Sequence, residues 1–161
     1  FVPAAFPPHK TERQFSLPEV RCQLVEAAIA NTAQFEISKV ELKRSGPNYM
    51  VDTLAELKTD PSFQNAELFL IIGADNCVTF QQWRDHTRIL SLAKLAVYPR
   101  YESNLTRISR NIFRNAVVFN APRMEISSSY VRSLVRSGKP IAYLVPQSVD
   151  NLIKTFGLYK Q

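Results

Sequence analysis

The run Leu-Phe-Leu-Ile-Ile at residues 68–72 is apolar at every position. A strand with one face in water would alternate apolar and polar residues, so an unbroken apolar run is typical of a strand with helices on both faces of a parallel sheet. We predict that this run forms the middle strand of such a sheet. Other β-rich runs alternate with helical patterns, at residues 1–3, 35–42, 95–98 and 117–119. This alternation predicts an α/β fold with a mainly parallel sheet.

The limits of the helices follow from cap, proline and glycine signals. Ser16 and Glu19 have the spacing of a capping box, which predicts a helix start at Ser16. Helices are expected at residues 16–31, 50–58, 127–137 and 146–156. Within residues 35–42 the apolar positions change phase near Ser38 and Lys39, which predicts a twist or a bulge there.

Size and composition favour one domain. The chain has 161 residues, of which 45% are hydrophobic, enough for one core and too few to expect two. No apolar run approaches the roughly 20 residues of a membrane-spanning helix, and Cys22 and Cys77 lie in no metal or redox motif. We expect a single domain over residues 1–161 in a soluble, cytoplasmic protein with no membrane partner, in which both thiols are buried and reduced.

The net charge of +6 predicts an anionic partner. The densest basic stretch, Arg107 to Arg114, contains apolar residues at helical spacing, which indicates a solvated helix face better than a nucleic-acid surface. Nucleotide phosphates account for the charge equally well. His9 and His86 are far apart in the sequence and have no third ligand beside them, so no protein-held metal is expected.

Ligands of open parallel sheets bind beyond the carboxyl ends of the strands. Gly73 and Asp75 directly follow the apolar run 68–72. Gly73 allows close approach of a ligand to the backbone, and the Asp75 carboxylate can accept hydrogen bonds from a ribose or a base. The alternative, that Gly73 only ends a strand and Asp75 only caps the next helix, stays open.

A second candidate is the run from Ile126 to Arg132, which contains Ser127, Ser128 and Ser129. Hydroxyls and free backbone N–H groups at a helix start bind phosphate, and an arginine one turn later can bind the same anion. A single serine cap with two bystanders is the alternative, and Arg132 tips the balance towards phosphate binding. Trp83, the only tryptophan, is a core residue or a platform for a flat ring.

Taken in order, these segments resemble the nicotinate mononucleotide adenylyltransferase family over essentially the whole chain. The matching segments are Pro7–Lys10, Ser45–Leu54, Leu70–Asp75 with Phe80 and Trp83, Ser127–Arg132, and Tyr143–Pro146 through Gly157–Tyr159. The resemblance implies a Rossmann-like, three-layer fold of the nucleotidyltransferase type. It also implies transfer of AMP from ATP, accompanied by Mg²⁺, to nicotinate mononucleotide, giving deamido-NAD and pyrophosphate.

The resemblance further implies roles for individual residues. The catalytic, phosphate-contacting positions are His9, Lys10 and Arg132. The nicotinate mononucleotide positions are Tyr49, Thr53, Trp83 and Arg100. The ATP positions are Gly73, Asp75, Ile126, Ser127, Ser128, Ser129 and Arg132. Nothing in the sequence fixes the oligomeric state, a homo-oligomer included.

Three features depart from the family pattern. The chain has no counterpart of the GGTFDPxHxGH loop, and it begins with a predicted strand; we therefore expect a fragment that lacks the first strand and its loop. Met50 stands where a threonine is usual, and Pro99-Arg100 leaves Arg100 as the basic residue of its segment. Two alternatives to an enzyme stay open: a non-catalytic nucleotide-binding module of the same fold, and an RNA-binding domain.

Overall fold

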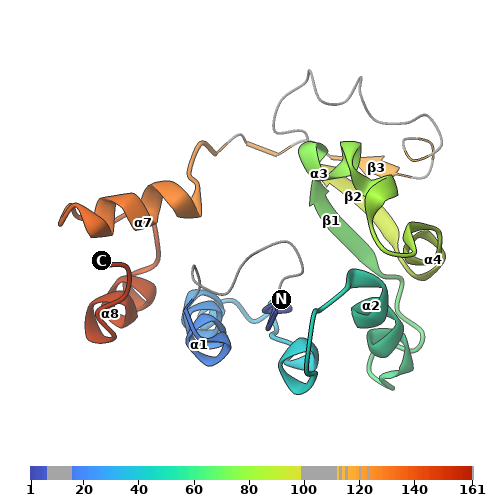
Figure 1. The fold of residues 1–161 in the computed structure, drawn as a ribbon, viewed down its shortest axis with the longest axis horizontal. Helices are drawn as coiled ribbons and strands as arrows, with labels where there is room; N and C mark the ends of the chain where they lie inside the picture. Colours follow the sequence, from blue (N-terminus) through green and yellow to red (C-terminus); the bar gives the residue numbers. More distant parts are fainter. Residues whose placement is uncertain are drawn as a thin grey trace. The chain divides into compact units, whose positions relative to one another are not determined.

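The computed structural model describes residues 1–6, 16–98, 112, 114, 116–119, 121–122 and 124–160. The chain divides into two compact units (Figure 1). Unit 1 contains Phe1–Asn48 and Met124–Gln161, and unit 2 contains Tyr49–Arg123. Each unit has its own apolar core. The single domain expected over residues 1–161 stays a prediction.

Unit 2 is built on a parallel sheet of three described strands. These are β1 (Phe69–Gly73), β2 (Lys94–Tyr98) and β3 (Ala116–Val118), in the order β1-β2-β3. Phe69 pairs with Lys94, and Leu95 pairs with Ala116, so all three strands run in the same direction. The strands lie within one residue of the predicted runs 68–72, 95–98 and 117–119, and the parallel sheet is confirmed.

The middle strand of the described sheet is β2, so the prediction for the run 68–72 is wrong in this respect. Leu95 and Val97 of β2 are fully buried, whereas Ile71 of β1 is 68% exposed. Burial of a strand depends on its neighbours in the sheet as well as on its own sequence, and β2 has a partner on each side. An apolar run therefore identified a strand but not its position in the sheet.

Helices of unit 2 pack around this sheet. They are α2 (Met50–Thr59), α3 (Ala74–Val78), the short 3₁₀ helix η3 (Phe80–Gln82) and α4 (His86–Leu92). The helix predicted at residues 50–58 is confirmed. It ends before Asp60-Pro61 because a proline disfavours the helical conformation of the residue that precedes it. The fully buried Phe80, Ile89 and Leu95 form the centre of the core.

Unit 1 contains four described helices. They are α1 (Pro18–Ile29), the 3₁₀ helix η2 (Val40–Lys43), α7 (Ser128–Arg136) and α8 (Gln147–Thr155). Val131 of α7 and Ile153 of α8 are buried in a common cluster, against which Leu24 of α1 packs. The Ser148 hydroxyl of α8 donates a hydrogen bond to the Ala27 carbonyl of α1 at 2.7 Å. The apolar faces of α1, α7 and α8 therefore pack together.

The capping box predicted at Ser16 and Glu19 is wrong. The residue before α1 is Leu17, which makes no side-chain cap bond, and the Ser16 hydroxyl instead donates to the Tyr159 hydroxyl at 3.3 Å. Pro18 has no N–H group to donate to a cap, and its fixed φ suits the first helical position. Proline therefore starts this helix one residue later than the box required.

The strands predicted at residues 1–3 and 35–42 are not formed. The Phe1 amino group donates to the Glu36 carbonyl at 2.6 Å, and Ser38 N–H donates to the Phe1 carbonyl at 2.8 Å. The chain then turns into η2, where the adjacent residues Val40 and Glu41 are both buried. A helical turn allows this, whereas a strand sends successive side chains to opposite faces. The change of apolar phase thus marks a helical turn and not a bulge.

Cys22 and Cys77 are buried free thiols, as predicted. Burial raises the pKa of both thiols, and the nearby Glu26 carboxylate raises the pKa of Cys22 further. Among the described residues, no helix has the length and apolar character needed to cross a bilayer.

Candidate active site

Gly73 and Asp75 lie at the carboxyl end of β1, where α3 begins. Gly73 has a φ of −69°, which any residue can adopt, so the glycine is not required by its backbone conformation. A Cβ atom at position 73 would instead collide with Oδ1 of Asp75. The Asp75 carboxylate therefore lies against the backbone of Gly73, and it is exposed to solvent.

Asp75 lies in the first turn of α3, whose N-cap residue is Gly73. Within residues 73–79 the N-terminal end of α3 receives no side-chain capping bond. The carboxylate keeps its acceptor oxygens available at the sheet edge where ligands of parallel sheets bind. The role of Asp75 as a binding residue stays a prediction.

Tyr49 and Trp83 pack against the same core of unit 2. Tyr49 immediately precedes α2, and Trp83 follows η3, with its ring centroid 5.3 Å from that of the buried Phe80. Both aromatic side chains are half-buried. Each ring is thus fixed by the core while part of its surface stays open.

Thr53 supports Tyr49 from the next turn of α2. Its side chain is 2% exposed, and its hydroxyl donates to the Tyr49 carbonyl at 3.3 Å. A hydroxyl bonded to the carbonyl four residues earlier is a local helix interaction. Thr53 therefore helps to hold the backbone of Tyr49.

The structure adds Arg84, which the sequence reasoning missed. Its guanidinium carbon lies 4.4 Å from the centroid of the Tyr49 ring, a cation–π contact. The signal in the sequence was a basic residue directly after the only tryptophan. It could not be interpreted without knowing that Tyr49, 35 positions earlier, lies beside it.

Ser127 is the N-cap of α7, as the capping interpretation of the serine run required. Its side-chain oxygen accepts a hydrogen bond from Tyr130 N–H at 3.1 Å. Ser128 and Ser129 are exposed, and within the part of the chain that the structure describes their backbone N–H groups have no recorded acceptor. The helix start therefore combines a structural cap with two N–H groups free to bind an anion.

Arg132 lies one turn into the same helix. Its guanidinium donates to the Ser129 hydroxyl at 3.2 Å and lies 6.0 Å from the centroid of the Tyr159 ring. These contacts hold a positive charge beside the start of α7. Ile126, also predicted to bind ATP, directly precedes the cap residue Ser127. It is half-buried, and its packing against the core of unit 1 holds the chain at the helix start.

His9, Lys10 and Arg100 lie outside the described residues. The residues that flank His9 and Lys10 are held by hydrogen bonds. The Arg21 guanidinium donates to the carbonyls of Ala4, Ala5 and Ser16, the bond to Ala5 being 2.9 Å long. Arg21 thereby joins the chain before residue 7 to the chain after residue 15.

Asn48 makes a second connection to the chain before residue 7. Its side-chain oxygen accepts a hydrogen bond from Phe6 N–H at 2.7 Å, and its backbone N–H donates a hydrogen bond to the Phe6 carbonyl at 2.9 Å. Asn48 is 6% exposed, so these bonds are shielded from water. The position of Phe6 is therefore fixed from two directions.

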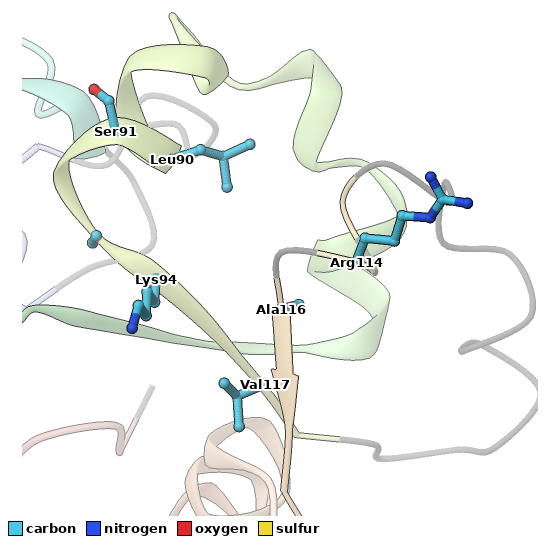
Figure 2. A pocket seen from close by; sticks show the side chains of 7 residues that line it. Leu90, Ser91, Lys94, Arg114, Ala116 and Val117 are labelled. Atoms are coloured by element: carbon cyan, nitrogen blue, oxygen red, sulfur yellow. The ribbon is translucent and has the colours of Figure 1, made fainter.

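One pocket of unit 2, of about 620 Å³, contains none of the predicted site residues (Figure 2). It is lined by Leu90, Ser91, Ala93, Lys94, Arg114, Ala116 and Val117. Lys94 and Ala116 are the first residues of β2 and β3, so the pocket lies at the amino ends of these strands. Figure 2 shows the side chains of Lys94 and Arg114 extending away from each other, and Lys94 pairs with Glu67. The predicted site residues Gly73 and Asp75 instead lie at the carboxyl end of β1.

Residues 1–134 match the family model described as Cytidylyltransferase-like. The structure also resembles nicotinic acid mononucleotide adenylyltransferase of Plasmodium falciparum. The complex of that protein with NaAD aligns with a TM-score of 0.71 and 17% identity, over 99% of this chain and 80% of that chain. Its complex with APC aligns with a TM-score of 0.66 over 91% of this chain and 77% of that chain. The chain therefore has the α/β fold of the cytidylyltransferase-like nucleotidyltransferases, as predicted.

Two bacterial proteins are similar over almost the whole chain. Each is named "Probable nicotinate-nucleotide adenylyltransferase". The protein of Desulfitobacterium hafniense strain Y51 is 36% identical over 99% of this chain and 80% of its own length. The protein of Tropheryma whipplei strain TW08/27 is 38% identical over 99% of this chain and 82% of its own length. The chain belongs to the nicotinate-nucleotide adenylyltransferase family, and the resemblance found in the sequence is confirmed.

Proposed function

We propose that this protein transfers AMP from ATP to nicotinate mononucleotide, giving deamido-NAD and pyrophosphate in the synthesis of NAD. The observation that carries the proposal is the similarity to two nicotinate-nucleotide adenylyltransferases over 99% of the chain. The available donors at the start of α7 and the aromatic pair Tyr49 and Trp83 give the two nucleotides matching partners.

The reaction is an in-line substitution at the α-phosphorus of ATP. A phosphate oxygen of nicotinate mononucleotide forms a bond to this phosphorus, and the bond to the oxygen that bridges the α- and β-phosphates breaks. Pyrophosphate leaves with the electron pair. Such transfers need little covalent assistance, so positioning of two anions and stabilisation of the developing charge supply most of the rate.

On the ATP side, we assign phosphate binding to the start of α7. The N–H groups of Ser128 and Ser129 and the guanidinium of Arg132 can donate to phosphate oxygens, while Ser127 and Ile126 hold the helix start in place. The Asp75 carboxylate is proposed to accept hydrogen bonds from the ribose or the base, and Gly73 is proposed to allow the ligand to approach the backbone closely. His9 and Lys10 are proposed to contact phosphates during the transfer, and their flanking residues are those held by Arg21 and Asn48.

On the nicotinate side, Trp83 is proposed to stack on the pyridine ring. Its ring is held by Phe80 and remains half-exposed, and flat aromatic rings favour offset stacking. Tyr49, supported by Thr53, is proposed to form the adjacent wall. Arg100 is proposed to contact the mononucleotide as the basic residue of its segment.

We propose that Mg²⁺ enters with ATP. Among the described residues, no group of three or more His, Cys, Asp or Glu side chains could hold a metal ion. When bound, the metal would supply positive charge that neutralises part of the polyphosphate, which makes pyrophosphate a better leaving group.

The proposal is tested by measuring pyrophosphate release from ATP with and without nicotinate mononucleotide. We expect release only when both nucleotides are present, together with deamido-NAD identified by mass spectrometry. Isothermal titration with each nucleotide separates the alternatives. Binding of both nucleotides without formation of product would indicate a non-catalytic binding module. An affinity for RNA that is the same for any RNA sequence and falls steeply with salt would indicate an RNA-binding domain.

A further inference from the structure

Arg84 places a positive charge over Tyr49, one of the two aromatic residues of the proposed nicotinate site. It directly follows Trp83, and its guanidinium lies over the ring of Tyr49, 4.4 Å from the centroid. Tyr49 and Trp83 both pack against the core of unit 2, so the ring that anchors Arg84 and the ring proposed for stacking belong to one rigid framework.

The charge of Arg84 is available for a ligand. The residue is exposed, and among the described residues its one recorded interaction is with the ring of Tyr49. The neighbouring carboxylate of Asp85 accepts a hydrogen bond from the Thr87 hydroxyl at 3.4 Å, in the first turn of the next helix. Asp85 also has a left-handed φ of 48°, which turns the chain immediately after Arg84.

The two pyridine mononucleotides differ at one substituent of the ring. Nicotinate carries a carboxylate, and nicotinamide carries a neutral carboxamide. A guanidinium forms paired, charge-assisted hydrogen bonds with a carboxylate and weaker single bonds with an amide oxygen. A guanidinium within reach of this substituent therefore discriminates between the two ligands, and contacts with the ribose and the phosphate do not.

We propose that Arg84 is a specificity-determining residue that makes the site favour nicotinate mononucleotide over nicotinamide mononucleotide. This inference rests on the proposed function, because it takes Trp83 as the platform for the pyridine ring. The contact with Tyr49 limits the rotamers of Arg84, which lowers the entropy lost when the guanidinium binds a carboxylate.

The only tryptophan of the chain makes binding measurable without catalysis. Titration of the protein with each mononucleotide, followed by Trp83 fluorescence, gives the two dissociation constants. For Arg84→Gln we expect the dissociation constant of nicotinate mononucleotide to rise about tenfold, the loss of one charge-assisted contact at a partly exposed site. The value for nicotinamide mononucleotide should change less than about twofold. Arg84→Lys keeps the charge but cannot form the paired bonds, so it should restore only part of the preference.

Arg88→Gln is the matched control. Arg88 is an exposed arginine in α4 of the same unit, so its loss changes the net charge equally. It should leave the ratio of the two dissociation constants unchanged. A similar fall in preference in this control would show a long-range effect of charge and overturn the role of Arg84.

The remaining outcomes separate this inference from the proposed function. An unchanged ratio in Arg84→Gln, or an equal loss for both ligands, overturns the inference and leaves Arg84 as a support for Tyr49. Tight binding of nicotinate mononucleotide with the expected loss in Arg84→Gln, but no adenylyl transfer, supports the inference and overturns the enzymatic function. Absence of binding by either mononucleotide overturns both.

Discussion

At the start of α7, Arg132 and Ser129 are joined by a hydrogen bond of 3.2 Å. This bond uses the Ser129 hydroxyl and holds the guanidinium over the first turn, beside the N–H groups that the helix leaves without partners. Arg132 is thus prepared for an anion before one arrives, because less side-chain freedom remains to be lost on binding.

Replacing Arg132 with alanine should therefore lower kcat/KM by roughly one to two orders of magnitude. The estimate follows from the loss of one charge-assisted bond of about 1.5–3 kcal/mol. Steady-state kinetics with varied ATP measure the effect. Lys139→Ala, which removes an exposed charge beyond the other end of α7, is the control and should leave the kinetics unchanged. Unaltered kinetics of Arg132→Ala would remove this arginine from the site.

Gly73 tests the role of Asp75. Alanine can adopt the backbone conformation of Gly73, so Gly73→Ala should change the free energy of unfolding by less than about 1 kcal/mol. Its Cβ would nevertheless displace the Asp75 carboxylate. We expect kcat/KM for ATP to fall about tenfold, and the fall should not add to that of Asp75→Asn, because both changes remove the same contact. Additive losses would show that Gly73 acts independently of Asp75.

Glu26 and Lys39 give unit 1 a defined response to acid. Their ion pair is 2.8 Å long, and the hydrogen bond from Lys39 lowers the pKa of Glu26 below its ordinary value of 4.5. A carboxyl whose pKa is depressed in the folded state contributes stability above its unfolded pKa, and this stability is lost as the pH falls through the folded value.

Glu26→Gln should therefore be less stable than the wild type at neutral pH, and the difference should diminish as the pH falls below 4.5, the ordinary pKa. Chemical denaturation at several pH values measures this. Salt should also reduce the difference, because both side chains of the pair are partly exposed. A difference that persists undiminished at low pH would assign the effect to packing.

At the scale of single elements, Arg21 joins α1 to the chain before residue 7. One guanidinium binds carbonyls on both sides of residues 7–15. These bonds explain why a charged residue is tolerated on the inner side of α1, because each carbonyl it binds would otherwise lose a partner.

Arg21→Met should lower the free energy of unfolding by about 3 kcal/mol, since it leaves several carbonyls without their charged donor. It should also raise the KM for ATP, because His9 and Lys10 lie in the segment whose ends Arg21 holds. Urea denaturation and kinetics give the two values, with Arg88→Met as the control for loss of an exposed arginine. A loss of stability below about 0.5 kcal/mol would show that Asn48 alone is sufficient to hold the chain before residue 7.

The elements that the sequence predicted well are those fixed by local signals. The helix at α2 is bounded by Gly46-Pro47 and Asp60-Pro61, and β1 and β2 are short apolar runs. The elements that it missed depend on distant partners. The Ser16 hydroxyl pairs with Tyr159, which lies 143 positions away, and a local capping rule cannot include that competition.

The same reasoning applies to the candidate site. Ser127, Gly73 and Asp75 were predictable because a cap or a strand end is visible in a few consecutive residues. Arg84 and Asn48 were not, because their roles come from contacts with Tyr49 and Phe6 across 35 and 42 positions. A resemblance to a family supplied Trp83 and Tyr49, and the core of unit 2 gives a physical reason for their fixed positions.

At the scale of the whole molecule, two apolar cores have to be stabilised by one chain. Leu95 is fully buried in unit 2, and Ile153 is 4% exposed in unit 1. If residues 1–161 form the single domain expected from the sequence, the two cores should unfold in one cooperative transition.

Leu95→Ala and Ile153→Ala should each cost about 2–5 kcal/mol of stability through the cavity they leave. In a single domain, each substitution lowers the same melting transition, seen by circular dichroism and by Trp83 fluorescence alike. A fluorescence transition that responds to Leu95→Ala and not to Ile153→Ala would show that unit 2 unfolds independently.

The placement of the two cysteines has a practical consequence. Cys22 lies in unit 1 and Cys77 in unit 2, and both are buried with pKa values raised by burial. The thiolate is the form that attacks an alkylating reagent, so each buried sulfur is labelled only when its own surroundings open transiently. The rates of labelling at the two cysteines can be resolved by peptide mapping. They report separately how often unit 1 opens around Cys22 and unit 2 opens around Cys77, with no probe attached beforehand.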